Sequence, residues 1–152
     1  MDSTEQKIKE LGYKVQNLDE RFRAHKHAGF DQTNQIFSFG TYTPTLTHTT
    51  NVGASTAYSM LYLRVGDIVF VSGRVDIDAD AAGDTSLGMS LPIGSRFALD
   101  GDCSGVFNQY GSAAEQGVVY ANTTSYIANI NYYAVSTSNQ AGRVFFMYKI
   151  IV

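Results

Sequence analysis

The amino-acid sequence predicts a mainly β fold, an antiparallel β-sandwich of jelly-roll type preceded by a short amino-terminal α-helical coiled coil. Three observations predict it. Of the 11 Lys and Arg and 14 Asp and Glu residues, 12 lie within residues 1–36 of the 152-residue chain. Apolar residues repeat there with heptad spacing. From Phe37 onward they alternate with period two. We therefore expect a coiled-coil helix over residues 1–24, a junction over residues 25–36 and a β-sandwich knob over residues 37–152.

The first expected element is a helix with one narrow apolar stripe. Its apolar residues are spaced three and four apart and occupy heptad positions a and d: Ile8, Leu11, Val15, Leu18 and Phe22. The remaining faces are charged or polar, so such a helix is not stable alone. It either packs on its own domain or pairs with copies of itself, and the strict a/d stripe favours self-pairing. Ile and Val at a with Leu at d are typical of dimers, but contacts of a fused domain override so short a seam, so the number of helices stays open.

Two of the three histidines, His25 and His27, lie where the helical pattern ends. The heptad places His25 at the next d position. If the backbone becomes extended at Ala24, residues two apart point the same way, and the two imidazoles share one face. In one interpretation His25 fills a layer of the coiled coil while His27 caps the helix end or contacts the knob. The alternative, a metal site, depends on the number of chains.

The knob is expected to contain about eight strands separated by Gly, Asn, Asp and Ser turns. The expected strand segments are residues 37–47, 54–65, 64–84, 87–93, 103–110, 116–124, 125–136 and 141–152. Within segment 64–84, the first half is apolar on both faces and is expected to be covered on both sides, whereas the second half is expected to be half-exposed. The apolar end of the chain, residues 145–152, is expected to be buried and paired with a strand or a subunit.

Composition excludes several functional classes. A net charge of −3 gives no electrostatic support for nucleic-acid binding. The sequence has no signal peptide, so secretion is not expected. It has no apolar run of about 18 residues, so membrane insertion is not expected either. The single cysteine, Cys103, excludes an internal disulfide framework and is expected to be a small buried residue. No catalytic motif occurs, so we expect no enzyme and no catalytic residue, although two carboxylates could still converge in space for glycoside hydrolysis.

Two residue groups admit a functional and a structural interpretation. Four aspartates raise the question of a calcium site: Asp76, Asp78, Asp80 and Asp84. Ala81 and Leu87 stand where an EF-hand loop has Gly and Glu, so alternation along a solvent-facing strand explains the aspartates better. Nine of the ten tyrosines lie beyond residue 36. They are expected mainly to pack in strands, and alternatively form an aromatic, hydroxyl-rich surface for sugars or a protein receptor.

The order of these features resembles virion structural proteins of tailed bacteriophages. The resemblance lies in HKHAGFDQTNQI (25–36), FGTYTPTLT (39–47), LRVGDIVFVSGRVDID (63–78), LGMSLPIGS (87–95) and AGRVFFMYKIIV (141–152). It implies a tail-fibre, tail-tip, head-fibre or decoration protein that assembles as a homotrimer in the virion. The coiled coil is then expected to contact another virion protein, and the knob is expected to bind a glycan or protein of the host surface.

The resemblance also bears on the histidines. In some trimeric phage fibres, H-x-H motifs of three chains surround a transition-metal ion. His25 and His27 are thus expected metal ligands on a three-fold axis, where six imidazoles suit iron, nickel or zinc. No other cofactor is expected. A carbohydrate-active depolymerase module and a non-viral lectin-like module remain the alternative functions.

Overall fold

The computed structural model describes residue 6 and residues 37–110, 115–137 and 140–152. The chain divides into two units, residues 1–36 and residues 37–152. Apart from residue 6, the expected coiled coil and junction lie outside the described residues, and so do the seam and histidine positions Ile8, Leu11, Val15, Leu18, Phe22, His25 and His27. Among the described residues, no helix is both long and apolar enough to cross a membrane.

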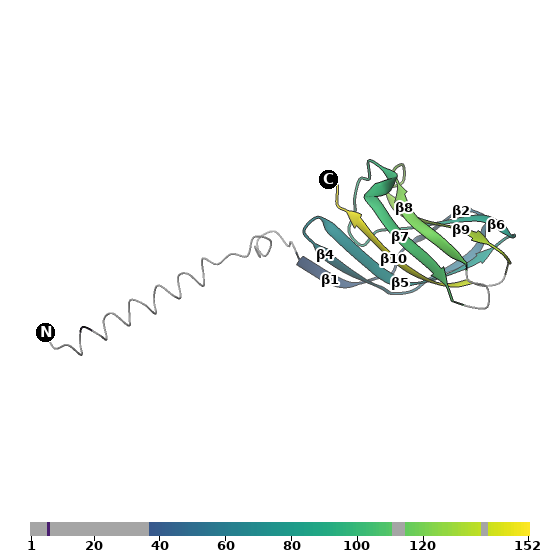
Figure 1. The fold of residues 1–152 in the computed structure, drawn as a ribbon, viewed down its shortest axis with the longest axis horizontal. Coiled ribbons are helices and arrows are strands. Elements are labelled where there is room, and N and C mark those ends of the chain that lie inside the picture. The colour runs from purple at the N-terminus through teal and green to yellow at the C-terminus, as the bar shows by residue number, and fades with distance from the viewer. Residues whose placement is uncertain (1–5, 7–36, 111–114, 138–139) are drawn as a thin grey trace. The chain divides into compact units, whose positions relative to one another are not determined.

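Residues 37–152 are mainly β, which confirms the predicted class (Figure 1). The described part of this unit holds ten strands and one 3-10 turn: β1 (Phe37–Tyr42), β2 (Leu46–Thr50), β3 (Val52–Ala57), β4 (Met60–Val65), β5 (Ile68–Ala79), β6 (Gly83–Met89), η1 (Asp100–Asp102), β7 (Cys103–Gln109), β8 (Gln116–Asn122), β9 (Ile127–Ala134) and β10 (Gln140–Lys149). Two expected segments each divide into two strands. Residues 43–45, with Pro44 at their centre, separate β1 from β2 because proline cannot donate to a strand ladder. Tyr58 and Ser59 separate β3 from β4.

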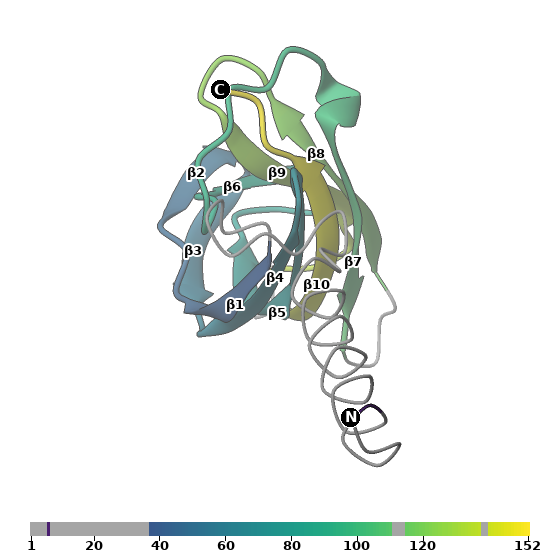
Figure 2. The same ribbon diagram turned by 90° about the vertical axis from the view of Figure 1, so that its left-hand side faces the viewer.

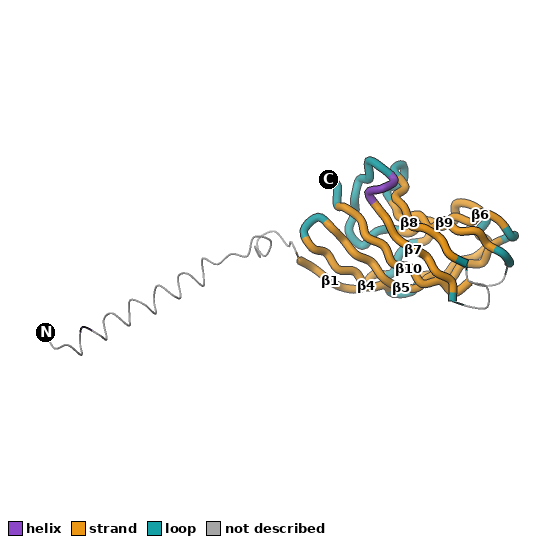
Figure 3. Tube along the Cα trace, viewed as in Figure 1, coloured by secondary structure: helices purple, strands orange, loops and turns teal. Residues whose placement is uncertain are grey.

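The strands form one continuous antiparallel sheet rather than the two sheets of the expected jelly roll. Its order is β1-β4-β5-β10-β7-β8-β9-β6-β2, with β3 paired to the far part of β5. The sheet curls around its own inner face (Figures 2 and 3). Strands β2 and β3 approach each other across the remaining gap, where His48 Nε2 lies 2.8 Å from Ser55 Oγ. Alternation identifies strands and their inward faces but not the partner of each strand, so a curled single sheet satisfies the same pattern.

The core lies inside the curl and is built from side chains in register on successive strands. One row of residues crosses the sheet in register and lies in the core: Val71, Phe146, Gly105, Val119, Ile130 and Leu87. Strand β10 occupies the centre, between β5 and β7, which confirms the expectation that the carboxy-terminal strand is paired. Its side chains alternate: Phe146 and Tyr148 are buried, whereas Phe145 and Met147 on the opposite face are half-exposed.

One end of the core is closed by the segment between β6 and β7. The buried ring of Phe97 contacts Tyr148 edge-on, with ring centroids 5.9 Å apart. The Tyr148 hydroxyl donates to the Ile93 carbonyl at 2.7 Å and accepts from the Ile93 N–H at 3.1 Å. Cys103 is buried beside them, as the sequence predicted, and burial raises the pKa of its thiol to about 12. A thiol of that pKa stays protonated and unreactive at neutral pH.

The expectation for the long strand β5 is confirmed only in part, since Arg74 in its second half is exposed as expected. On the outer side of its first half, Ile68 and Phe70 are only partly covered and Ser72 is exposed. In its second half, Asp76 is buried. The sequence could not distinguish the two cases, because the pairing of β3 and the position of Tyr58 determine which part of β5 is covered.

Candidate ligand-binding site

A row of polar side chains crosses the outer face of the sheet at the middle of β5. Phe37 pairs with Val65, which pairs with Ile68 at the start of β5. Arg74 lies six residues further along β5, roughly 20 Å away at the usual rise of a strand. In register with Arg74 are Arg143 on β10 and, beyond it, Asn108 on β7. Phe37 therefore lies level with the start of β5, whereas the arginine row, formed by Arg74, Arg143 and Asn108, crosses the middle of β5.

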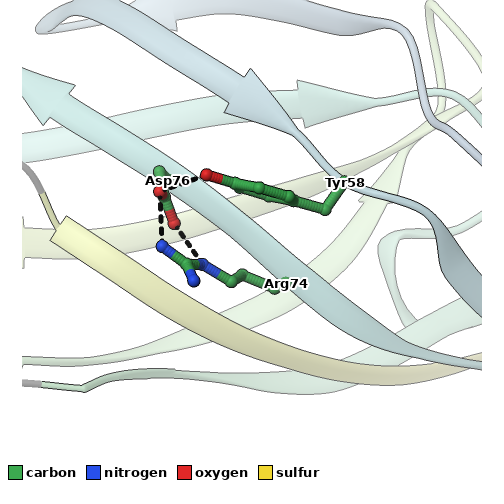
Figure 4. Close-up of polar contacts among 3 residues, drawn as sticks. All are labelled: Tyr58, Arg74 and Asp76. Atoms are coloured by element: carbon green, nitrogen blue, oxygen red, sulfur yellow. Dashed lines mark hydrogen bonds and ion pairs between the residues drawn. The ribbon is translucent and has the colours of Figure 1, made fainter.

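The Arg74 guanidinium is held by a carboxylate and an aromatic ring (Figure 4). Arg74 and Asp76 are two residues apart on β5, so their side chains share a face. Arg74 Nε donates to Asp76 Oδ1 at 2.8 Å, and Nη2 donates to Oδ2 at 2.7 Å. The Tyr58 hydroxyl donates to Asp76 Oδ2 at 2.9 Å, and the Arg74 guanidinium carbon lies 4.6 Å from the centroid of the Tyr58 ring. Tyr58 reaches this position because the preceding residue, Ala57, pairs with Val75.

The two arginines stand directly opposite each other, an arrangement in which like charges repel. Asp76 neutralises Arg74. Arg143 is exposed and, among the residues that the structure describes, has no ion-pair partner; its guanidinium lies 5.8 Å from the centroid of the Tyr110 ring. The Tyr110 side chain is itself 76% exposed. The row consequently presents one uncompensated positive charge between two exposed aromatic rings.

A shallow pocket of about 490 Å³ opens beside these side chains. Its polar lining comes from Ser59, Ser72, Arg74, Asn108 and Arg143. Its apolar lining consists of Leu61, Gly73, Val106, Val144 and Phe145. Hydroxyl, amide and guanidinium donors next to apolar and aromatic surface suit a polar ligand that has both hydrogen-bonding groups and a hydrophobic face.

The Asp76 carboxylate makes the cluster sensitive to acid. Hydrogen bonds from Arg74, and secondarily from Tyr58, hold the pKa of Asp76 below its ordinary value of 3.8. Between the folded and the unfolded pKa of Asp76, the unfolded chain binds more protons than the folded chain. The stabilisation that the ionised Asp76 carboxylate gives the fold is therefore complete above about pH 4 and is lost as the pH falls through the folded pKa. We expect Asp76→Asn to be less stable than the wild type at pH 7, with the difference shrinking toward pH 2. Urea unfolding at several pH values measures this, and a pH-independent difference would contradict it.

The aspartates differ from the expected solvent-facing row. Asp76 is buried and paired, Asp78 is half-buried, and Asp80 and Asp84 are exposed. Within the described part of the chain, no three His, Cys, Asp or Glu side chains lie close enough to hold a metal ion. The i, i+2 spacing of Arg74 and Asp76 was visible in the sequence. The approach of Arg143 was not, because it depends on the register of β5 with β10.

The described tyrosines divide between the two expected roles. Tyr132 and Tyr148 are buried in the core, and burial raises the pKa of the Tyr132 hydroxyl to about 12. Tyr58, Tyr110 and Tyr133 are exposed. The first two flank the arginine row. The packing interpretation is confirmed for the buried tyrosines, and the surface interpretation stays a prediction for the exposed ones.

Comparisons with known proteins found no matching family model and no matching curated protein. Among solved structures, the chain is similar to a reovirus attachment protein, sigma1, crystallised in complex with alpha-2,3-sialyllactose. The two are 12% identical, the likeness covers 78% of this chain and 69% of that one, and the TM-score is 0.49. At this identity and TM-score, nothing about activity, ligand or assembly follows for this chain.

Proposed function

We propose that the protein is a non-enzymatic structural protein of a tailed-bacteriophage virion, a homotrimeric fibre or tail-tip subunit whose knob binds the host surface. The sequence features that resemble such proteins support the virion role. The observation that carries the binding role is the arginine row, with its uncompensated Arg143 between Tyr58 and Tyr110. It crosses β5 at Arg74, six residues along that strand from Ile68, which lies level with Phe37.

The pocket is suited to a host glycan that carries an anionic group. Arg143 would pair with the carboxylate or phosphate, since a guanidinium binds such planar or multi-oxygen anions through two parallel hydrogen bonds. Asn108, Ser59 and Ser72 supply partners for sugar hydroxyls. The exposed faces of Tyr58 and Tyr110 offer stacking surfaces for the apolar side of a sugar ring.

The same chemistry favours binding over glycoside hydrolysis. The lining of the pocket contains no carboxylate. The nearest acid, Asp76, uses both oxygens to accept hydrogen bonds, and its lowered pKa keeps it ionised at neutral pH. A hydrolase needs one carboxyl group that can donate a proton and a second one at a defined distance.

The test is a binding assay of the full chain on immobilised bacterial surface polysaccharides, both acidic and neutral. We expect Arg143→Ala to weaken binding to an acidic polysaccharide about tenfold or more, because a charge-assisted pair is lost. Arg96→Ala is the matched control, since Arg96 is an exposed arginine outside the pocket. Equal losses for the two variants, or no binding to any polysaccharide, would contradict the proposal. Release of reducing sugar would favour the depolymerase.

A further inference from the structure

The outer surface of the curled sheet carries apolar side chains on six neighbouring strands, β1, β4, β5, β10, β7 and β8, with exposed Ser72 on β5 and exposed Ser104 on β7 among them. Its members lie in two rows of register, one through Leu61, Phe145, Val106 and Val118 and one through Phe39, Leu63, Phe70 and Met147. We call these eight side chains the apolar outer face. The exposed fractions of six of them are large: Phe39 74%, Leu61 64%, Val106 56%, Val118 56%, Phe145 50% and Met147 45%.

The face also contains a groove. It encloses about 590 Å³ and is lined by side chains of β1, β4, β5 and β10, mostly apolar: Phe39, Gly40, Thr41, Leu61, Tyr62, Leu63, Phe70, Val71, Ser72 and Phe145. No charged side chain belongs to either row of the face. The arginine row lies one step further along the strands, at the margin.

Such an apolar surface is large for a monomeric protein. The exposed parts of these side chains come to on the order of 600 Å², the upper end of the largest patches found on typical monomers. This approaches the roughly 800 Å² that each partner contributes to a stable protein interface. Residues 68–71 of β5 and 144–148 of β10 are apolar on both faces, a pattern typical of strand segments covered on both sides. The described chain covers only one side.

Three arguments indicate that a second copy of this chain covers the apolar outer face. The face is uncharged, so it does not select a partner by charge. Strand β1, which supplies Phe39, begins at the point where residues 1–36 join the knob, and the heptad seam of that segment favours self-pairing. Helices joined in a bundle would hold the knobs at high effective concentration, so that modest apolar faces associate without further affinity.

We propose that the apolar outer face is the surface through which the knobs of the homotrimer pack on one another. This inference rests on the homotrimer of the proposed function and assigns its knob contacts to Phe39, Leu61, Val106, Phe145 and their row neighbours. Leu61, Val106 and Phe145 also line the pocket, so packing of the face covers the apolar wall of the pocket and leaves Arg74 and Arg143 at the edge of the contact.

The test is the reactivity of single introduced cysteines in the full chain, combined with light scattering. Val106→Cys lies in the face, whereas Val135→Cys is its matched control, a valine of nearly equal exposure, 55%, outside the face. The native Cys103 is not expected to react with the maleimide, because it is buried and the pKa of its thiol is about 12. For a trimer, we expect a water-soluble maleimide to label Val106→Cys at least about tenfold more slowly than Val135→Cys, since only the former must wait for the interface to open.

The outcomes separate the two proposals. A wild-type chain that scatters light as a monomer overturns the homotrimer and the inference together. A wild-type trimer in which both cysteines react at the same rate overturns the inference alone. A second variant, Phe145→Glu, places a charge in the face. A trimer whose thermal midpoint and cysteine protection are unchanged by it also overturns the inference, and loss of protection supports it.

Discussion

Phe146→Ala is expected to lower the free energy of unfolding by about 3–5 kcal/mol, the range found when a buried aromatic ring is removed and its cavity remains. Phe146 is fully buried on the central strand β10, between Val71 on one side and Gly105 on the other. Its ring stacks on that of Tyr148 with centroids 6.2 Å apart. A cavity at this position cannot collapse easily, because paired strands hold the surrounding backbone on both sides.

Urea unfolding at a fixed protein concentration measures the Phe146→Ala effect. The control is Leu99→Ala, which truncates a large apolar side chain that is 67% exposed and is expected to cost less than about 1 kcal/mol. If the two variants lose equal stability, the assignment of Phe146 to the core is wrong.

Gly105→Ala is expected to have the second large effect. It lowers the free energy of unfolding by about 3 kcal/mol, because an added methyl group overpacks a closely paired site. A Cβ atom at Gly105 would lie 2.3 Å from the Phe145 carbonyl oxygen and 2.3 Å from Phe146 Cβ. These neighbours belong to the backbone and to the base of a side chain, so neither can rotate away. The substitution therefore forces β7 and β10 apart at the middle of the sheet.

Gly101→Ala is the matched control for Gly105→Ala. A Cβ atom at Gly101 meets nothing within 4 Å, so this change is expected to leave the thermal midpoint nearly unaltered. Differential scanning calorimetry of the two variants compares them directly. Equal midpoints would show that β7 and β10 do not approach each other as described.

The two sides of the curled sheet have different expected roles. The inner side forms the core. The outer side carries the apolar outer face and, next to it, the arginine row. Arg143 and Phe145 are two residues apart on β10 and point to the same side. Phe145 also lines the pocket, so Phe145→Glu is expected to affect both packing and ligand binding, whereas Arg143→Ala is expected to affect ligand binding.

Much of the β character was predictable from local pattern. Alternation identified most of the segments that became strands, and turn residues marked most of their ends. Strand β6 was missed as a unit, because the expected segments 64–84 and 87–93 divide it. The division of two segments into four strands was missed, although Pro44 was a signal for one of them. The candidate site was only partly predictable: the Arg74–Asp76 spacing and the abundance of tyrosine were visible, but neither predicted that Arg143 and Tyr110 lie beside them.

The sequence by itself determined which residues form strands and which side chains share a face, because a period of two is a property of the local backbone. The tertiary structure alone decided that the strands form one curled sheet instead of two, that Asp76 is buried, and that Arg143 stands opposite Arg74. Phe145 and Phe146 show the reason. They are chemically identical neighbours, and only the pairing of distant strands and the direction of the curl place one ring in the core and the other on the surface.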